Sequence, residues 1–562
     1  MTRTKSLFTR PPNPTFFRVS RHGAVAAAVL VFGLGLWHFN WHGERMGGGL
    51  CFLSIPNGPP VCGPGTTYYP PAYLAFVRLA QALVGFNYPR VIYIQASFVL
   101  LAALYVGALA RRVGMGEASY LPAVLFLLLP GTTLAARNLE TEMPLLLILP
   151  AFAYHLAASA GFRDRKHSFL AGAWAGLGLL TKWTFPAYVV GYALVAGASM
   201  FFPAPCPSPS QREWPSAGQW WNAALAMLVA IAACGWWYVG VFDRDLWIAT
   251  TRNHPARLTY SYGLSLADYL GYVGQMAGLP AVIWIVLGLA FTRRRGRVFL
   301  ALVFGIALPL LVLAVPVHNE PRYAYPFAPA AALAFALAAT DPRRPGRRRL
   351  GAAVAIGASA LFYFLSPDAW AALSPSPCTM GPGHLARFSN DPILDRQSVA
   401  DRLARVAPEL KNRPANVGVH PLWYNFHVRP EILTYEIARR DMARRFRAPF
   451  YWEYAYGEWR DELRRGGFDI VLLDCGPSGD CPATDREMVD DLVNKAGSYR
   501  FVNQRSGRVA PAFTWDDILS DLDRLHREFR QAAVFDFGDC TRAAVWIKRS
   551  YEGREEKGTS PE

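Results

Sequence analysis

The sequence predicts an α-helical polytopic membrane protein with about eleven transmembrane helices and a C-terminal extracytoplasmic α/β domain. Of its 562 residues, 52% are hydrophobic and only 17% are charged, and the apolar residues gather in blocks between Val25 and Leu365. Many blocks approach the roughly 20 residues that a helix needs to cross a bilayer core. The block from Phe299 to Val317 has no polar face, which argues against a large soluble helical protein.

The first apolar run follows a basic amino terminus, as a secretory signal would. However, the run from Gly23 to Phe39 ends in aromatic residues and has no small-residue cleavage site nearby. We therefore expect residues 1–22 to be cytoplasmic and the first helix to stay as an anchor.

The segment from Pro71 to Phe86 decides the topology. It is apolar but short, and it carries Arg78 at its middle, where a charge would be costly inside a bilayer. We therefore predict an interfacial helix here. The spans are then expected near residues 23–40, 91–110, 118–135, 143–160, 168–181, 186–202, 219–241, 270–291, 298–316, 323–340 and 350–366.

With this choice, every basic cluster falls on one side of the membrane, which is the cytoplasmic side by the positive-inside rule. The clusters are Arg3 to Arg21, Arg111-Arg112, Arg163 to Lys166, Arg293 to Arg297 and Arg343 to Arg349. If residues 71–86 spanned the bilayer, the last four clusters would switch sides. The net charge of +16 is then largely a topology signal and requires no nucleic acid.

The cysteines fit the same topology. Six of them fall on the outer side, and an even outer set suits an oxidising compartment. These six are Cys51, Cys62, Cys378, Cys475, Cys481 and Cys540. Connectivity stays open, although Cys51 with Cys62 and Cys475 with Cys481 are near enough in sequence to bridge. A structural zinc site is the weaker interpretation, because the spacing is loose and no histidine is near.

The polar tail, residues 367–552, alternates short β-rich runs with polar helical stretches, the pattern of a small α/β domain. The β-rich runs include residues 417–420, 468–473 and 544–547, and the helical stretches include 398–410 and 515–532. No glycine-rich phosphate loop follows the strands, so we assign no nucleotide. We favour a lid or docking module over an independent catalytic domain, and we expect residues 553–562 to be disordered.

Three outer loops collect polar side chains on one face of the membrane. They contain Glu44 and Tyr69 in the first loop, residues 137–142 in the second, and residues 318–323 in the third. A carboxylate there can accept a proton from an incoming hydroxyl or amine, while basic groups neutralise the phosphate of a lipid-borne leaving group.

Glu44 and Glu142 are the candidates for the proton acceptor, and Arg137, Lys182 and Arg322 are the candidates for holding the donor phosphate. A simpler role remains open for each of two residues. Glu142 would then only complement the dipole of the following helix, and Arg322 would only anchor a helix at the membrane interface. Further substrate-site candidates are Tyr69, Glu140, His318, Glu320 and Tyr323. No cofactor or metal is assigned, and a divalent metal is left open.

Several stretches together resemble the GT-C superfamily of polyprenyl-phosphate-sugar-dependent glycosyltransferases, nearest to the protein O-mannosyltransferase and lipid A aminoarabinose transferase group. They are the acidic first outer loop, the Tyr-Pro-Pro start of the interfacial helix, Glu142-Met-Pro-Leu-Leu-Leu, the Gly-Leu-Gly-Leu-Leu-Thr stretch that ends at Lys182, and Arg322-Tyr-Ala-Tyr-Pro. The resemblance covers about residues 20–366, so we assign residues 23–366 to a GT-C-like domain.

The resemblance implies transfer of a sugar from a polyprenyl-phosphate donor to a lipid, glycan or protein acceptor on the outer face, with inversion at the sugar carbon. It maps the catalytic base to Glu44 and a second acidic residue to Glu142. From the spans and the basic clusters, we expect the protein in a bacterial inner membrane. The family usually has Asp where this chain has Glu44 and Glu142. This difference keeps open a non-catalytic member that binds a polyprenyl lipid. A lipid or solute transporter is the other alternative, since it would also be polytopic, although it should show internal repeats and no clear repeat is seen.

Overall fold

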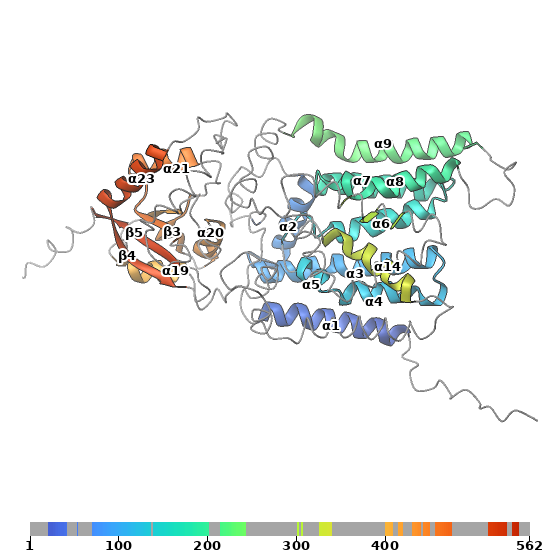
Figure 1. Ribbon diagram of the computed structural model, residues 1–562, viewed down its shortest axis with the longest axis horizontal. Helices are drawn as coiled ribbons and strands as arrows, with labels where there is room; N and C mark the ends of the chain where they lie inside the picture. Colours follow the sequence, from blue (N-terminus) through green and yellow to red (C-terminus); the bar gives the residue numbers. More distant parts are fainter. Residues whose placement is uncertain are drawn as a thin grey trace, which may run out of the picture.

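The computed structural model has two parts, a bundle of long helices and a smaller α/β unit at one end of it (Figure 1). It describes residues 21–41, 53, 70–136, 139–201, 214–242, 301–302, 305–306, 309, 325–339, 399–408, 414–419, 430–439, 442–449, 456–474, 515–536 and 542–549. The predicted spans at 270–291 and 350–366 lie outside these residues, and so does most of the predicted span at 298–316.

The described helices of the bundle are mainly apolar. Its helices are α1 (Arg21–Trp41), α2 (Pro71–Val84), α3 (Tyr88–Arg112), η4 (Gly116–Tyr120), α4 (Leu121–Leu128), α5 (Pro130–Ala136), α6 (Leu145–Ala158), α7 (Arg165–Thr181), α8 (Phe185–Phe201), α9 (Ala217–Gly240) and α14 (Ala328–Ala339). Most bounds agree with the predicted spans to within a few residues, because long apolar runs allow little else.

Within the described residues, α3 and α9 are the two helices long and apolar enough to cross a membrane, and several shorter apolar helices accompany them. Large apolar side chains project from their outer surfaces: Leu104 is 68% exposed, Trp221 73% and Val239 91%. Such surfaces are unfavourable in water but suit a lipid environment. The bundle is therefore the membrane part of the chain.

The predicted span 118–135 is not one continuous helix. It consists of η4, α4 and α5, with a break at Leu129, whose extended backbone (φ −65°, ψ 129°) precedes Pro130. A residue before proline avoids the helical region, which explains the break. The hydroxyl of Thr132 donates to the carbonyl of Phe126 at 2.6 Å and so satisfies an acceptor at the end of α4.

Helix α2 has the properties predicted for an interfacial helix. It lies across the end of the bundle that faces the α/β unit (Figure 1). Tyr73, Val77 and Ala80 form its buried stripe, whereas Arg78 and Leu83 are exposed. One face therefore packs on the bundle while the other is free for the membrane surface.

In the described residues, the α/β unit is built on a five-stranded sheet of order β2-β1-β3-β5-β4. The strands are β1 (Ala415–Val419), β2 (Phe446–Arg447), β3 (Ile470–Asp474), β4 (Phe529–Asp536) and β5 (Arg542–Lys548); the helices are α19 (Val399–Val406), α20 (Pro430–Arg439), η11 (Met442–Arg444), α21 (Tyr456–Arg464) and α23 (Trp515–Glu528). Strands β2, β1 and β3 are parallel, and β5 and β4 continue the sheet antiparallel.

The helix expected over 515–532 ends earlier, at Glu528, and the chain continues directly as β4. Residues 530–532 favour a helix by intrinsic propensity, but β4 pairs with β5 from Phe529 to Asp536. Phe529 and Phe535 are buried in this strand. Sheet pairing and burial therefore override local propensity here.

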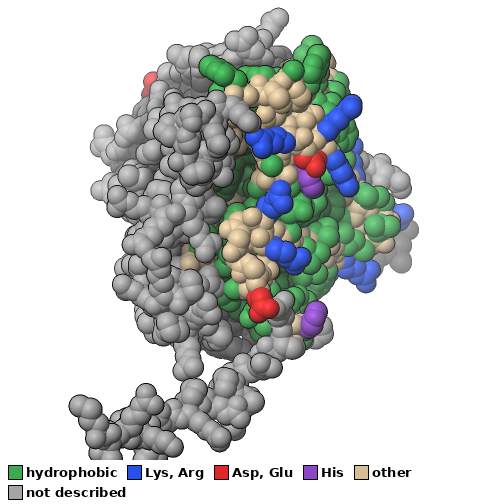
Figure 2. All heavy atoms as spheres, turned by 90° about the vertical axis from the view of Figure 1, so that its right-hand side faces the viewer, with side chains coloured by type: hydrophobic (Ala, Val, Ile, Leu, Met, Phe, Trp, Pro, Cys, Tyr) green, Lys and Arg blue, Asp and Glu red, His purple; other side chains and the backbone are tan. Residues whose placement is uncertain are grey.

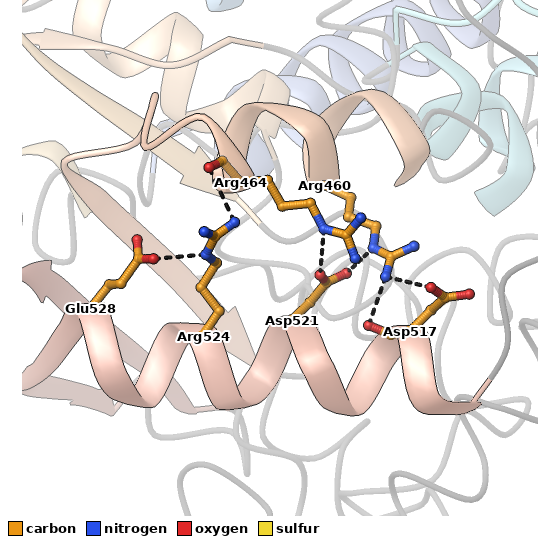
Figure 3. Close-up of polar contacts among 6 residues, drawn as sticks. All are labelled: Arg460, Arg464, Asp517, Asp521, Arg524 and Glu528. Carbon is orange, nitrogen blue, oxygen red and sulfur yellow. Dashed lines mark hydrogen bonds and ion pairs between the residues drawn. The ribbon is translucent and has the colours of Figure 1, made fainter.

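An ion-pair network holds α23 against α21 (Figure 3). The guanidinium of Arg460 contacts Asp517 and Asp521, each at 2.6 Å, and Arg464 reaches Asp521 at 3.4 Å. Burial disfavours the charge of Arg460, yet its two carboxylate partners raise its pKa overall. The network thus keeps a buried arginine charged and fixes the position of α23.

Candidate functional site

A buried ion pair joins two of the residues singled out from the sequence. The ammonium of Lys182 donates to Oε1 of Glu142, and the hydroxyl of Thr141 donates to Oε2 of the same carboxylate at 3.0 Å. Glu142 is fully buried and Lys182 is 4% exposed. Burying either charge alone would be costly, so each requires its partner.

The pair lies at the end of the bundle that faces the α/β unit. Helix α3 begins there, because the N–H of its first residue, Tyr88, donates a hydrogen bond to the α/β unit. At the opposite end of α3, Arg112 donates to the carbonyl of Ala158, the last residue of α6. Helix α6, which begins three residues after Glu142, therefore starts at the near end. Lys182 follows the last residue of α7 at the same end (Figure 1).

The glycines before Lys182 set its position. A Cβ at Gly178 would lie 2.5 Å from the ring of Phe185, so a side chain there would prevent the turn from α7 into α8. The N–H of Lys182 still donates to the carbonyl of Gly178 at 2.9 Å, while its own backbone is extended. Lys182 therefore leaves the helix axis and reaches across to Glu142.

Two further glycines of the same motif hold α7 against α9. A Cβ at Gly172 would clash with the backbone of Ala226, and one at Gly176 would lie 2.6 Å from the Cβ of Ala233. Small residues four apart let two membrane helices approach closely. The glycine-rich stretch is therefore a packing face that carries Lys182 at its end.

A second layer of buried polar groups lies next to the pair. The hydroxyl of Tyr73 donates to Oε1 of Gln95 at 2.6 Å, and the amide of Gln95 donates to the carbonyl of Ala136 at 3.2 Å. Burial raises the pKa of Tyr73 well above its ordinary value, and the negative charges of Glu140 and Glu142 raise it further. Tyr73 therefore stays a neutral hydrogen-bond donor beside two carboxylates.

Tyr73 and Gln95 were not among the residues singled out from the sequence, although both leave a signal in it. Tyr73 begins the apolar stripe of the interfacial helix, and Gln95 is a polar residue inside an apolar span, where polar groups usually have a function.

The structure brings three of the predicted site residues to this end of the bundle, namely Glu140, Glu142 and Lys182, all of them buried. The other predicted residues lie outside the described part of the chain: Glu44, Tyr69, Arg137, His318, Glu320, Arg322 and Tyr323. The six cysteines assigned to the outer side also lie outside it, whereas Cys234 is a buried free thiol in α9. Among the residues that are described, no group of three or more His, Cys, Asp or Glu is arranged to hold a metal ion.

The opposite end of the bundle is rich in basic side chains, as Figure 2 shows. Arg111 and Arg112 end α3, and Arg165 and Lys166 begin α7. The buried Glu142–Lys182 pair and this basic surface therefore lie at opposite ends of the helices, the arrangement predicted for an outer and a cytoplasmic side.

Comparison with known proteins identifies relatives of the membrane part and of the whole fold. Residues 69–237 match the family model of dolichyl-phosphate-mannose-protein mannosyltransferases. The structure is similar to that of ArnT from Cupriavidus metallidurans, with 15% sequence identity over 96% of this chain and 98% of that one; the TM-score is 0.53 for the apo form and 0.54 for the form bound to undecaprenyl phosphate. The oligosaccharyltransferase of Archaeoglobus fulgidus gives a TM-score of 0.48 at 14% identity, covering 87% of this chain and 72% of that one. No curated protein sequence matches significantly.

These findings confirm the resemblance to the GT-C superfamily of membrane glycosyltransferases. The segment that matches the mannosyltransferase family contains Tyr73, Gln95, Glu140, Glu142 and Lys182. The described site therefore falls within the part of the chain that carries the family pattern.

Proposed function

We propose that this chain is a membrane glycosyltransferase that moves a sugar from a polyprenyl-phosphate donor to an acceptor on the outer face of the membrane. The observation that carries the proposal is the buried Lys182–Glu142 pair, which lies at one end of the helices within the segment that matches the mannosyltransferase family. The likeness to the ArnT structure bound to undecaprenyl phosphate supports a lipid phosphate as the donor's leaving group.

Lys182 would stabilise the departing phosphate. When the bond between the sugar carbon and the phosphate oxygen breaks, the electron pair stays on the phosphate, which gains negative charge. A preorganised ammonium in a water-poor site stabilises such charge far better than water does. Arg137 and Arg322 are proposed to assist.

Glu142 would serve to hold Lys182 in place. Both of its carboxylate oxygens already accept hydrogen bonds, one from Lys182 and one from Thr141. We therefore assign the proton transfer to Glu44, which would take the proton of the acceptor hydroxyl or amine as that group attacks the sugar carbon opposite the phosphate, with inversion. Tyr69, Glu140, His318, Glu320 and Tyr323 remain proposed as sugar and acceptor contacts.

The proposed location is the bacterial inner membrane, with the amino terminus in the cytoplasm and the α/β unit in the periplasm. The basic surface at the end opposite the site supports this orientation. The domain boundaries after residues 22, 366 and 552 are proposed from the apolar and polar stretches of the sequence.

The test measures donor binding and sugar transfer separately in the purified full chain, using a panel of polyprenyl-phosphate sugars. We expect Lys182→Met to weaken binding and abolish transfer, whereas Lys166→Met, which removes a lysine at the opposite end, leaves both unchanged. Lipid binding by the wild type without turnover of any donor would favour the non-catalytic alternative. Movement of a donor across sealed vesicles without sugar transfer would favour the transporter.

A further inference from the structure

We propose that Tyr435 of the α/β unit is a positioning residue for the site in the membrane part. Its hydroxyl completes the cap of α3. By fixing the start of α3, it also fixes Gln95, which is bonded to the chain just before the segment that carries Glu140 and Glu142. The role in sugar transfer rests on the proposed function, whereas the role in capping does not.

The first turn of α3 shows why an acceptor from elsewhere is needed. A helix begins with N–H groups that have no partner within the helix. At this terminus Pro89 has no N–H, and Asn87 accepts from Arg90 through its side chain and from Val91 through its carbonyl, both at 3.1 Å. The N–H of Tyr88 donates instead to the hydroxyl of Tyr435 at 3.1 Å, 347 residues away in the chain.

Tyr435 is well packed where it makes this bond. It is 1% exposed although it belongs to α20 of the α/β unit, and it joins the buried apolar cluster of the membrane part. The centroid of its ring lies 5.0 Å from that of Phe86, one of the three residues between α2 and α3. Both its ring and its hydroxyl therefore contact the corner between these two helices.

The same corner leads to the site through buried groups. Tyr88 and Gln95 are seven residues apart in α3, so they lie on one face of the helix, and both are buried. Gln95 bonds to Tyr73 of α2 and to the carbonyl of Ala136, the last residue of α5 before the segment that carries Glu140 and Glu142. A shift of the start of α3 would therefore move the groups next to the site.

The contact is tested first without any assay of activity. Hydrogen exchange of the full-length protein, followed by mass spectrometry, is compared for wild type, Tyr435→Phe and Thr434→Val. Tyr435→Phe keeps the ring but removes the acceptor, and we expect the Tyr88 amide to exchange about tenfold faster. Thr434→Val is the control, because its hydroxyl bonds to Ala448 within the α/β unit. Equal exchange in wild type and Tyr435→Phe would overturn the capping role.

Transfer kinetics with a polyprenyl-phosphate sugar test the second step. We expect Tyr435→Phe to lower kcat while KM for the donor stays unchanged, with unfolding behaviour close to wild type; Thr434→Val should leave kcat unchanged. Faster exchange with unaltered kcat would overturn the positioning role but not the cap. If wild type turns over no donor, the proposed function fails, and the exchange result still decides whether Tyr435 caps α3.

Discussion

Removal of one partner from the buried Lys182–Glu142 pair should destabilise the protein far more than removal of both. Lys182→Met leaves the fully buried carboxylate of Glu142 without its cation, and Glu142→Leu leaves a buried ammonium without its anion. An uncompensated buried charge costs about 3–5 kcal/mol, whereas replacing a whole pair by apolar side chains is often neutral or stabilising. The double variant Lys182→Met with Glu142→Leu should therefore be within about 1 kcal/mol of wild type.

Unfolding in mixed detergent micelles, followed by the fluorescence of the 17 tryptophans, measures the free energy of unfolding of all four proteins. A double-mutant cycle then yields a coupling energy, which we expect to be about 5 kcal/mol or more, because each single variant loses at least about 3 kcal/mol and the double variant at most about 1 kcal/mol. Sugar transfer should be absent in both single variants and also in the double variant, because the latter recovers stability without recovering the ammonium.

Additive single effects would refute this account of the pair. A coupling energy near zero would mean that the two charges are solvated separately and do not depend on each other. Transfer by the stable double variant would remove Lys182 from the mechanism even if the coupling were large.

Three other perturbations test the packing, the capping and the ion-pair network. Gly172→Leu should force α9 away from α7 and lower the unfolding temperature, whereas Gly197→Ala, with no atom within 4 Å of its Cβ, should be neutral in the same thermal scan. A hydrogen bond from a backbone amide in the first turn of α7 lowers the pKa of Asp164. The ionised carboxylate should therefore stabilise the helix near neutral pH, and this effect should disappear as the pH falls through the lowered pKa. Asp164→Ala should remove this acid dependence of thermal unfolding. Arg460→Met leaves the buried Asp521 without its closest cation and should destabilise the α/β unit by about 3 kcal/mol, measured by hydrogen exchange of β3 to β5.

The positions of the long helices were predictable because each depends on a local run of apolar residues. The interruption at Leu129 was missed in the predicted span 118–135, although Pro130 marks it in the sequence. Strand β4 was missed for a different reason: Phe529 to Asp536 becomes a strand only because β5 pairs with it. Local patterns thus account for α3 or α9, while β4 depends on a tertiary contact.

Glu142 and Lys182 could be selected as candidates from the sequence, but the contact between them could not be predicted. Glu142 and Lys182 were assigned separate tasks, one for the proton and one for the phosphate, and nothing local shows that they pair across 40 residues. The contact between Tyr435 and Tyr88 is more distant still. Hydropathy and helix periodicity describe neighbours along the chain, so contacts of this kind require the folded structure.

Sugar transfer by the purified protein tests the central claim most directly. Radiolabelled polyprenyl-phosphate sugars are supplied to wild type, Glu44→Gln and Glu117→Gln, the last of which changes a carboxylate in η4 at the basic end of the bundle. The account predicts that wild type and Glu117→Gln transfer label from a donor and release polyprenyl phosphate, while folded Glu44→Gln does not. Equal transfer by Glu44→Gln would contradict the assigned base, and no transfer from any donor by wild type would contradict the proposed enzyme.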